Sequence, residues 1–250
     1  MKNALVTGAG RNLGRGFALE LARQGHRVLL AGRTREPLES VREEILAARG
    51  SAEIVLLDVA DQSGTERALA VSLASYGPVS ILINNAVIRS QRPLLEMPVD
   101  EWRQVLDVTL TGAFLCTRAL LPGMIEQGWG RIVNMAGISG QTGVANRVGV
   151  SAAKAGVIGM TRAVAAEFAT SGITANAISP GGIDTEKGSW TSQGDRAAVL
   201  AHYEERARLI PMKRRGTVDE VAALCGYLCS DSAAFITGQV FNINGGTHMP

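Results

Sequence analysis

The sequence predicts an α/β fold built on a doubly wound parallel sheet of about seven strands, with helices on both faces. Short runs rich in Val, Ile and Leu alternate with longer helical patterns along all 250 residues. Hydrophobic residues make up 46% of the chain but aromatic residues only 4%, which is typical of strands that are buried on both faces. No linker or low-complexity run interrupts the alternation. We therefore expect residues 1–250 to form one domain.

Each expected strand is a short apolar run, and each expected helix is bounded by cap or breaker residues. The first strand begins at Ala4 and leads through a glycine-rich turn into a helix that ends at Gly25. Pro37 falls in the first turn of the next helix, and Asp61 can cap a third. The further strands are expected at residues 27–31, 53–57, 81–84, 131–135, 174–178 and 240–243, and the further helices at 35–49, 61–76, 100–127, 150–171 and 218–228.

Composition excludes several classes of function. The formal net charge is +2 and the basic residues are scattered, so nothing resembles a nucleic-acid footprint. No apolar run is expected to reach membrane-spanning length, and no signal peptide is expected before the first strand. Three cysteines fit a reducing cytoplasm. Cys225 and Cys229 are four residues apart on an expected helix, where we expect them to pack in the core rather than bind a metal.

The glycine-rich turn after the first strand predicts an anion site. It runs from Thr7-Gly8 to Gly14, directly before a helical pattern. Backbone N–H groups of such a turn and the dipole of the following helix favour negative charge. Glycine lets the ligand approach the backbone closely because it carries no Cβ. The pyrophosphate of a dinucleotide is the expected ligand.

Arginines near this turn favour NADP(H) over NAD(H). Arg33 follows the second expected strand, where an NAD site usually has an acidic side chain. Arg33 suits a 2′-phosphate instead, and Arg11 in the turn can reach the same group. The alternative is that both are ordinary solvated arginines. After the third strand, Asp58 and Val59 are expected to meet the adenine.

Four stretches together resemble the short-chain dehydrogenase/reductase superfamily, over nearly the whole chain. They are Thr7-Gly8 with Gly14, Asn84-Asn85-Ala86, Lys154-Ala155-Gly156, and the run from Asn176 to Pro180-Gly181-Gly182-Ile183-Asp184-Thr185. In particular, the chain resembles β-ketoacyl-carrier-protein-reductase-like members. The resemblance implies a Rossmann-like fold, an oxidoreductase that uses a nicotinamide nucleotide, and a homotetramer formed through two long helices and the C-terminal region.

The resemblance also assigns roles in the nucleotide site. Asn85 and Ala86 would line the adenosine ribose, Ile183 and Thr185 would hold the nicotinamide carboxamide, and residues 188–211 would form a substrate lid. The full set of expected cofactor-binding residues is Gly8, Arg11, Asn12, Leu13, Gly14, Arg33, Asp58, Val59, Asn85, Ala86, Lys154, Pro180, Gly181, Ile183 and Thr185.

The chain departs from the family at the catalytic residues. The family uses a tyrosine four residues before the lysine, and here that position is Val150. The carbonyl-polarising serine, thirteen residues earlier, is Gly137, and the asparagine that supports a relay water is Thr109. Of the four catalytic residues, only Lys154 remains. Because an isopropyl group cannot transfer a proton, the usual reaction route is absent.

Two further departures lie at the cofactor. The second glycine of the turn is Asn12, a mild change because Asn tolerates left-handed backbone angles better than most residues. The glycine that usually follows Asn-Asn-Ala is Val87, which adds bulk.

Three functions remain open. The first is an oxidoreductase with a relocated proton donor, for which Ser139 on the same loop and His202 or Tyr203 in the lid are candidates. Ser151 is discounted because one step along a helix turns about 100°. The second is a non-redox enzyme on the same fold, and the third is a catalytically inactive nucleotide-binding or regulatory protein. The retained nucleotide residues favour the first.

The substrate is expected to be a small molecule, and three arginines bear on its charge. Arg89 and Arg92 follow the fourth strand, and Arg147 precedes the Lys154 helix. If they face the pocket, they suit a carboxylate or a carrier-linked acyl group. The alternative is three solvated loop arginines.

The expected tetramer needs an apolar strip on the two long helices, beyond the face that packs on the sheet. Ala163, Ala166, Phe168 and Leu115 are the candidates for this strip. Without a partner, such a patch would favour aggregation.

Overall fold

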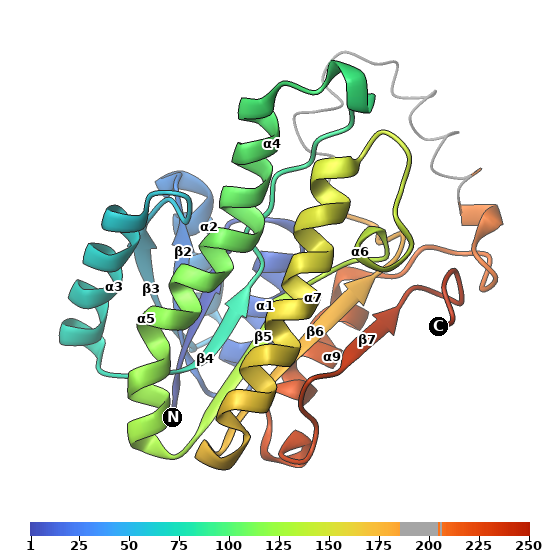
Figure 1. Cartoon of the computed structure of the whole chain (residues 1–250). Helices are drawn as coiled ribbons and strands as arrows, with labels where there is room; N and C mark the ends of the chain where they lie inside the picture. The colour runs from blue at the N-terminus through green and yellow to red at the C-terminus, as the bar shows by residue number, and fades with distance from the viewer. Residues whose placement is uncertain (186–204, 206) are drawn as a thin grey trace.

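The computed structural model describes residues 1–185, 205 and 207–250 and has one parallel sheet with the strand order β3-β2-β1-β4-β5-β6-β7 (Figure 1). The strands from β1 to β3 are added toward one edge of the sheet, and those from β4 to β7 are added toward the other edge. This change of direction between β1 and β4 is the doubly wound arrangement that the sequence predicts. The strands are β1 Asn3–Thr7, β2 Arg27–Gly32, β3 Ser51–Leu56, β4 Val79–Asn84, β5 Gly130–Met135, β6 Ile173–Pro180 and β7 Val240–Ile243.

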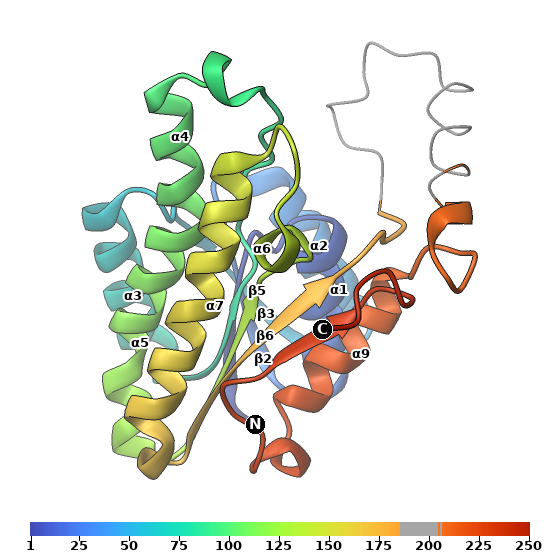
Figure 2. The ribbon, with the colours of Figure 1, turned by 45° about the vertical axis from the view of Figure 1, so that its right-hand side comes forward.

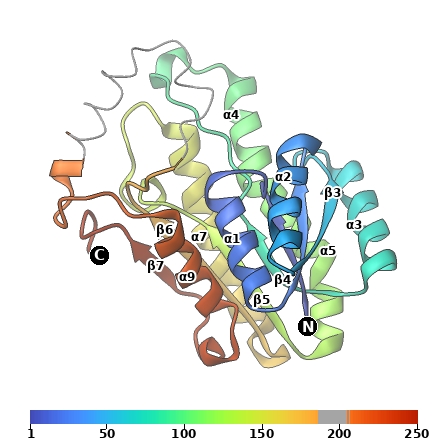
Figure 3. The same cartoon turned by 180° about the vertical axis from the view of Figure 1, so that it is seen from behind.

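Helices cover both faces of the sheet (Figures 1 and 3). One layer holds α1 (Asn12–Arg23), α2 (Arg35–Ala47) and α9 (Val218–Leu228). The other layer holds α3 (Gln62–Tyr76), α4 (Val99–Leu106), α5 (Gly112–Gln127) and α7 (Val148–Phe168). A short helix, α6 (Ser139–Thr142), lies beside the upper end of α7, near the tips of β5 and β6 (Figure 2).

Two large apolar cores and one small one fill the space between the sheet and its helix layers in the described part of the chain. Ala4 and Val6 of β1 contribute to the core under α1, α2 and α9, whereas Leu5 between them contributes to the other large core. This alternation follows from the two-residue period of a strand. Cys225 and Cys229 are buried in the first core, where they pack as expected. Every strand from β1 to β6 is thus covered on both sides, and its carboxyl end opens at one shared edge.

The expected helix over residues 100–127 is divided by a π-helical turn. The chain runs from α4 through Asp107–Thr111 in π geometry into α5. The combined helix, Val99–Gln127, is long and apolar enough by length and composition to cross a membrane, which corrects the expectation that no such run exists. Half of its most apolar window is nevertheless buried inside the protein, because α5 packs on β4 and α3. It is a core helix of this fold.

Some short elements have no signal in the sequence. The helix α6 and the 3-10 turns Leu94–Glu96 and Asp231–Ala233 are too short for apolar periodicity to show. The last helix and strand, by contrast, have the bounds that the sequence predicts. Most of the segment expected to form a lid, residues 188–211, lies outside the described residues, as do His202 and Tyr203.

Candidate active site

The end of β1 is joined to the end of β4 by a network of hydrogen bonds around Thr7. The Thr7 hydroxyl accepts from the backbone N–H groups of Asn85, at 2.9 Å, and Ala86, at 3.0 Å. The Asn85 side-chain amide donates to the backbone carbonyls of Thr7, at 3.0 Å, and Gly8, at 3.3 Å. These bonds fix the glycine turn against the segment that the resemblance assigns to the adenosine ribose.

The turn requires glycine at positions 8 and 14 and accommodates Asn at position 12, where the resemblance expects a glycine. A Cβ on Gly14 would lie 2.1 Å from the Gly8 carbonyl oxygen, so no side chain fits there. Gly8 has φ of 66°, in the left-handed region. Asn12 stands in for a glycine and has φ of 52°, a conformation that Asn adopts more readily than most residues. Its buried Oδ1 has no hydrogen-bond partner in the described chain, so an acceptor remains unused in the turn. Leu13 beside it packs against the core.

The expected adenosine end carries an arginine opposite an aspartate. Arg33 follows β2, and its Nη1 lies 3.6 Å from Oδ2 of Asp58 after β3. Both side chains are exposed, so the ion pair adds little stability and leaves the guanidinium accessible to a ligand. Val59, the next residue after Asp58, is buried. Arg11 is exposed at the N-cap position of α1.

Lys154 is buried on α7 at the end of β5. Lys154 is 8% exposed, and its Nζ donates a hydrogen bond to the backbone carbonyl of Met135. Burial lowers the pKa of Lys154 from 10.5 to about 8, because an ammonium is poorly solvated there. No carboxylate of the described chain forms an ion pair with it. Lys154 is therefore an amine that can release or take up a proton near neutral pH.

The two positions at which the resemblance expects a catalytic tyrosine and serine differ in their surroundings. Val150 is half-buried on α7, one helical turn before Lys154. Gly137 has φ of 109°, with no atom within 4 Å of the place that a Cβ would occupy. There is therefore room for a side chain at 137 but a backbone conformation that side chains rarely adopt. Thr109 lies in the π turn, and its buried hydroxyl has no partner among the described residues.

The helix α6, which begins at Ser139, is held over the ends of the last two strands. The Gln141 side-chain amide donates to Ser179 Oγ and to Asn242 Oδ1, each at 2.7 Å. Ser139 is half-buried at the first residue of α6, next to the open space at Gly137. The sequence analysis did not identify Gln141, because nothing in the spacing links it to Ser179 and Asn242.

The segment after β6 is held by its neighbours on both sides. The Gly181 N–H donates to the Ile243 carbonyl at 3.0 Å, and Ile183 forms a parallel bridge with Gly216. The Arg215 guanidinium donates to the Ile183 carbonyl and lies 3.4 Å from Asp184 Oδ1. Pro180 ends β6, and Thr185 is half-buried. The sequence analysis missed Arg215, which lies 32 residues from its partner.

The loops after β4 and before α7 are joined. Glu101 on α4 accepts from Ser90 Oγ at 2.7 Å and from Arg92 Nε at 2.8 Å, and the Arg92 N–H donates to the Asn146 carbonyl at 2.7 Å. Arg147 donates to Gln91 Oε1 at 3.0 Å. Two of the three arginines expected at the substrate thus hold loops together.

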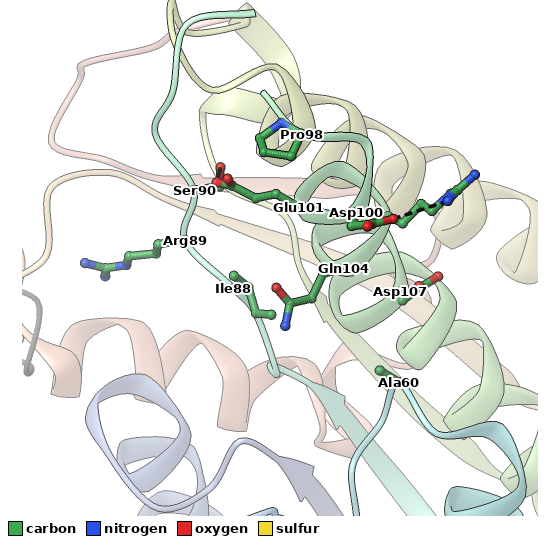
Figure 4. A pocket seen from close by; sticks show the side chains of 10 residues that line it. Ala60, Ile88, Arg89, Ser90, Pro98, Asp100, Glu101, Gln104 and Asp107 are labelled. Carbon is green, nitrogen blue, oxygen red and sulfur yellow. Dashed lines mark hydrogen bonds and ion pairs between the residues drawn. The ribbon is translucent and has the colours of Figure 1, made fainter. Parts of the chain in front are cut away.

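A cavity of about 750 Å³ lies between α4 and the loop after β4. In Figure 4, Ile88 and Gln104 face it from opposite sides, Ala60 lies below, and Arg89 points away from α4. Lys154 and Val150 are not among its lining residues. Val87, at the start of the same loop, is exposed.

Comparisons with known proteins cover almost the whole chain. Residues 8–248 match the model of the family described as enoyl-(acyl carrier protein) reductase. A 3-oxoacyl-[acyl-carrier-protein] reductase of Synechocystis is 38% identical over 98% of this chain and 96% of its own length. A protein of the same name from Aquifex aeolicus is 37% identical over 98% and 96%.

A solved structure agrees with this placement. The chain is similar to a putative gluconate dehydrogenase from Agrobacterium tumefaciens, with a TM-score of 0.91, 32% identity, and coverage of 98% of this chain and 95% of that one. Fold, glycine turn, buried lysine and relatives agree: the chain belongs to the short-chain dehydrogenase/reductase superfamily of oxidoreductases.

Proposed function

We propose that the protein is an NADP(H)-dependent oxidoreductase that interconverts a carbonyl and a hydroxyl group with a non-standard active site. The assembled dinucleotide cradle carries this proposal. The Thr7 and Asn85 hydrogen bonds, the close approach of Gly14 to Gly8, and the left-handed Asn12 preserve the shape of the turn in spite of the lost glycine. Bound there, NADP(H) supplies or accepts the hydride.

The preference for NADP(H) is supported by the charges at the ends of β2 and β3. Arg33 presents an exposed guanidinium where a 2′-phosphate would bind, and Arg11 adds a second cation at the start of α1. Asp58 faces Arg33 and would meet the adenosine beside it. Pro180, Gly181, Ile183 and Thr185 would hold the nicotinamide end, as the resemblance implies.

Lys154 is the residue that we propose to hold the transferred proton. A general acid works best when its pKa is close to the working pH, and burial brings the pKa of Lys154 to about 8. In the direction of carbonyl reduction the ammonium is the active form. Val150 forms an apolar neighbour one turn away, and Ser139 is the nearest replacement, in sequence, for the serine lost at 137.

Two other functions are supported by the same departures. A chain without a phenol at 150 and without a serine at 137 also suits a non-redox enzyme, or a catalytically inactive nucleotide-binding or regulatory protein. We rank them second because the nucleotide cradle and Lys154 are both retained.

The proposed substrate is a small molecule, anionic or linked to a carrier. Relatives named for 3-oxoacyl groups on acyl carrier protein and a neighbour named for gluconate support a substrate that carries negative charge, either on itself or on its carrier. We also propose a cytoplasmic homotetramer formed through α5 and α7. The exposed side chains on these helices include Phe114, Ala163 and Ala166. Leu115 is buried within the protomer and is removed from the expected strip, and Phe168 packs against the core.

Calorimetry with NADPH and NADH, followed by an NADPH oxidation assay on 3-oxoacyl thioesters and keto acids, tests the proposal. We expect NADPH to bind and at least one keto substrate to turn over. Lys154→Met should abolish turnover, whereas Lys213→Met, which changes an exposed lysine, should not. Absence of NADPH binding would refute the proposal, and binding without turnover would favour the inactive nucleotide-binding protein.

A further inference from the structure

Lys154 is a buried amine with a single hydrogen bond. Its Nζ donates to the backbone carbonyl of Met135, and it forms no other hydrogen bond or ion pair with the described residues. Burial alone lowers the pKa of Lys154 to about 8, with no charged neighbour contributing. A neutral amine can donate one hydrogen to the Met135 carbonyl and still direct its lone pair elsewhere. The lone pair of Lys154 is therefore available to a bound molecule.

The surroundings of this amine are open where the resemblance expects a phenol. Val150 lies one turn before Lys154 on the same face of α7, and its isopropyl group is smaller than a tyrosine side chain and forms no hydrogen bond. No atom lies within 4 Å of the place that a Cβ on Gly137 would occupy. At Gly140 the loop returns to α7, where an added Cβ would lie 2.7 Å from Lys154 Cβ. The space beside Lys154 is thus bounded by α6 (Figure 2), apolar at Val150 and unfilled at Gly137.

An amine in such a place suits nucleophilic catalysis. A lysine becomes a nucleophile when an apolar site favours its neutral form, and it then forms Schiff bases with carbonyl compounds. With a pKa of about 8, about a tenth of Lys154 is neutral at pH 7, against about one in three thousand for a lysine with the ordinary value of 10.5. A phenol at position 150 would compete for the lone pair by donating a hydrogen bond to it. Val150 cannot do so.

We propose that Lys154 forms a Schiff base with the C3 carbonyl of a small 3-oxo acid and so releases its carboxylate as CO₂, in a reaction that needs no nucleotide. This inference goes beyond the proposed function and takes from it only the class of substrate. Lys154 is the catalytic residue of this further activity. Val150 supplies the apolar neighbour that favours the neutral amine.

The reaction balances without an oxidant or a reductant. The lone pair of Nζ bonds to C3, and the carbonyl oxygen takes up the proton that the nitrogen loses. A second proton lets this oxygen leave as water, which gives an iminium ion. The positive charge of the iminium draws the electron pair of the C1–C2 bond as CO₂ leaves, and the product is an enamine. Protonation at C2 and hydrolysis of the iminium release a ketone and the free amine, so that one 3-oxo carboxylate and one proton become one ketone and one CO₂.

The experiment uses acetoacetate as the probe and the full chain without nucleotide. Sodium cyanoborohydride reduces the iminium to a stable amine, and peptide mass mapping locates it. At pH 7 we expect Lys154 to be modified about a hundredfold more than the exposed Lys213, because a lysine in water is almost wholly protonated. The protein should also release CO₂ from acetoacetate faster than the uncatalysed reaction. Lys154→Met and Lys154→Arg should lose this release entirely, whereas Lys213→Met should keep the wild-type rate.

The outcomes separate this inference from the proposed function. If no adduct forms on Lys154, or if Lys154→Met releases CO₂ as fast as the wild type, the inference is overturned, and NADPH binding with keto-substrate turnover would leave the proposed function standing. Equal modification of Lys2, Lys154 and Lys213 overturns it too, because it shows alkylation without a site. An adduct on Lys154 with CO₂ release, in a protein that does not bind NADPH, supports the inference and refutes the proposed function.

The wild type alone provides a test that depends on no variant. Cyanoborohydride should stop CO₂ release only in the presence of acetoacetate, and the loss of release should follow the fraction of Lys154 that is modified. Release that persists after Lys154 is fully modified would overturn the inference, even if Lys154→Met did not fold.

Discussion

Replacing Lys154 with Met should raise the free energy of unfolding at neutral pH. Burial lowers the pKa of Lys154 from 10.5 to about 8, so the unfolded chain holds this proton more tightly than the folded one. The cost of burying the ammonium is fully present below pH 8, and stability is regained as the pH rises from about 8 to 10.5. A gap of this size is worth about 3 kcal/mol. Methionine has no charge to desolvate, but the variant loses the hydrogen bond from the ammonium to the Met135 carbonyl, which costs about 2 kcal/mol because the donor is charged.

We therefore expect Lys154→Met to be more stable by about 1 kcal/mol at pH 7, with this advantage lost at pH 10. Urea unfolding at both pH values, followed by tryptophan fluorescence, measures this. The control is Lys213→Met, an exposed lysine on the surface, which should unfold as the wild type does. Equal pH slopes in Lys154→Met and the wild type between pH 8 and 10.5 would refute the argument, because the slope would then come from other groups.

Three further predictions concern the site and the assembly. Val150→Tyr should raise turnover of ketones with NADPH by about a hundredfold, since it places a phenol one turn before Lys154. Adding Gly137→Ser to this variant should lower its melting temperature, because φ of 109° is strained for serine. A double variant as stable as the single variant would contradict this. Arg33→Ala should weaken NADPH binding about tenfold and leave NADH unchanged by calorimetry; equal affinity of the wild type for both would remove the assignment. Phe114→Glu should split the tetramer in light scattering, because Phe114 is exposed on α5; a monomeric wild type would argue against the assembly.

The regular alternation of strands and helices along the chain makes the fold predictable from the sequence. The last helix shows why: Thr217 and Glu220 form a capping box that marks its start, and the apolar period carries it to Leu228. The π turn at Asp107–Thr111 has no comparable signal in the sequence, because its residues fit a continuous α-helical pattern equally well. Leu115, which the sequence analysis places on the outer strip, is buried within the protomer. One extra residue in the turn changes which side chains of α5 face outward.

The candidate site was predictable where motifs are contiguous and unpredictable where contacts join distant segments. The glycine turn and Lys154 were found from short spacings. The carbonyl of Met135 as the partner of Lys154, the Gln141 bridge to Ser179 and Asn242, and the contact of Arg215 with Ile183 all depend on the packing of separate elements. Asn12 lies between these cases, since its tolerance of left-handed angles was expected and its φ of 52° agrees.

The backbone at Gly137 makes the two departures from the catalytic residues that the resemblance implies unequal. Val150 lies on a regular helix, where a single substitution can exchange one side chain for another without moving the main chain. Gly137 has φ of 109°, so a serine codon restored there would act on a loop that now has a glycine-only shape. Recovery of that hydroxyl requires the loop to change together with the residue. A side chain at 137 therefore requires a change of loop conformation as well as of residue, whereas at 150 one substitution is enough.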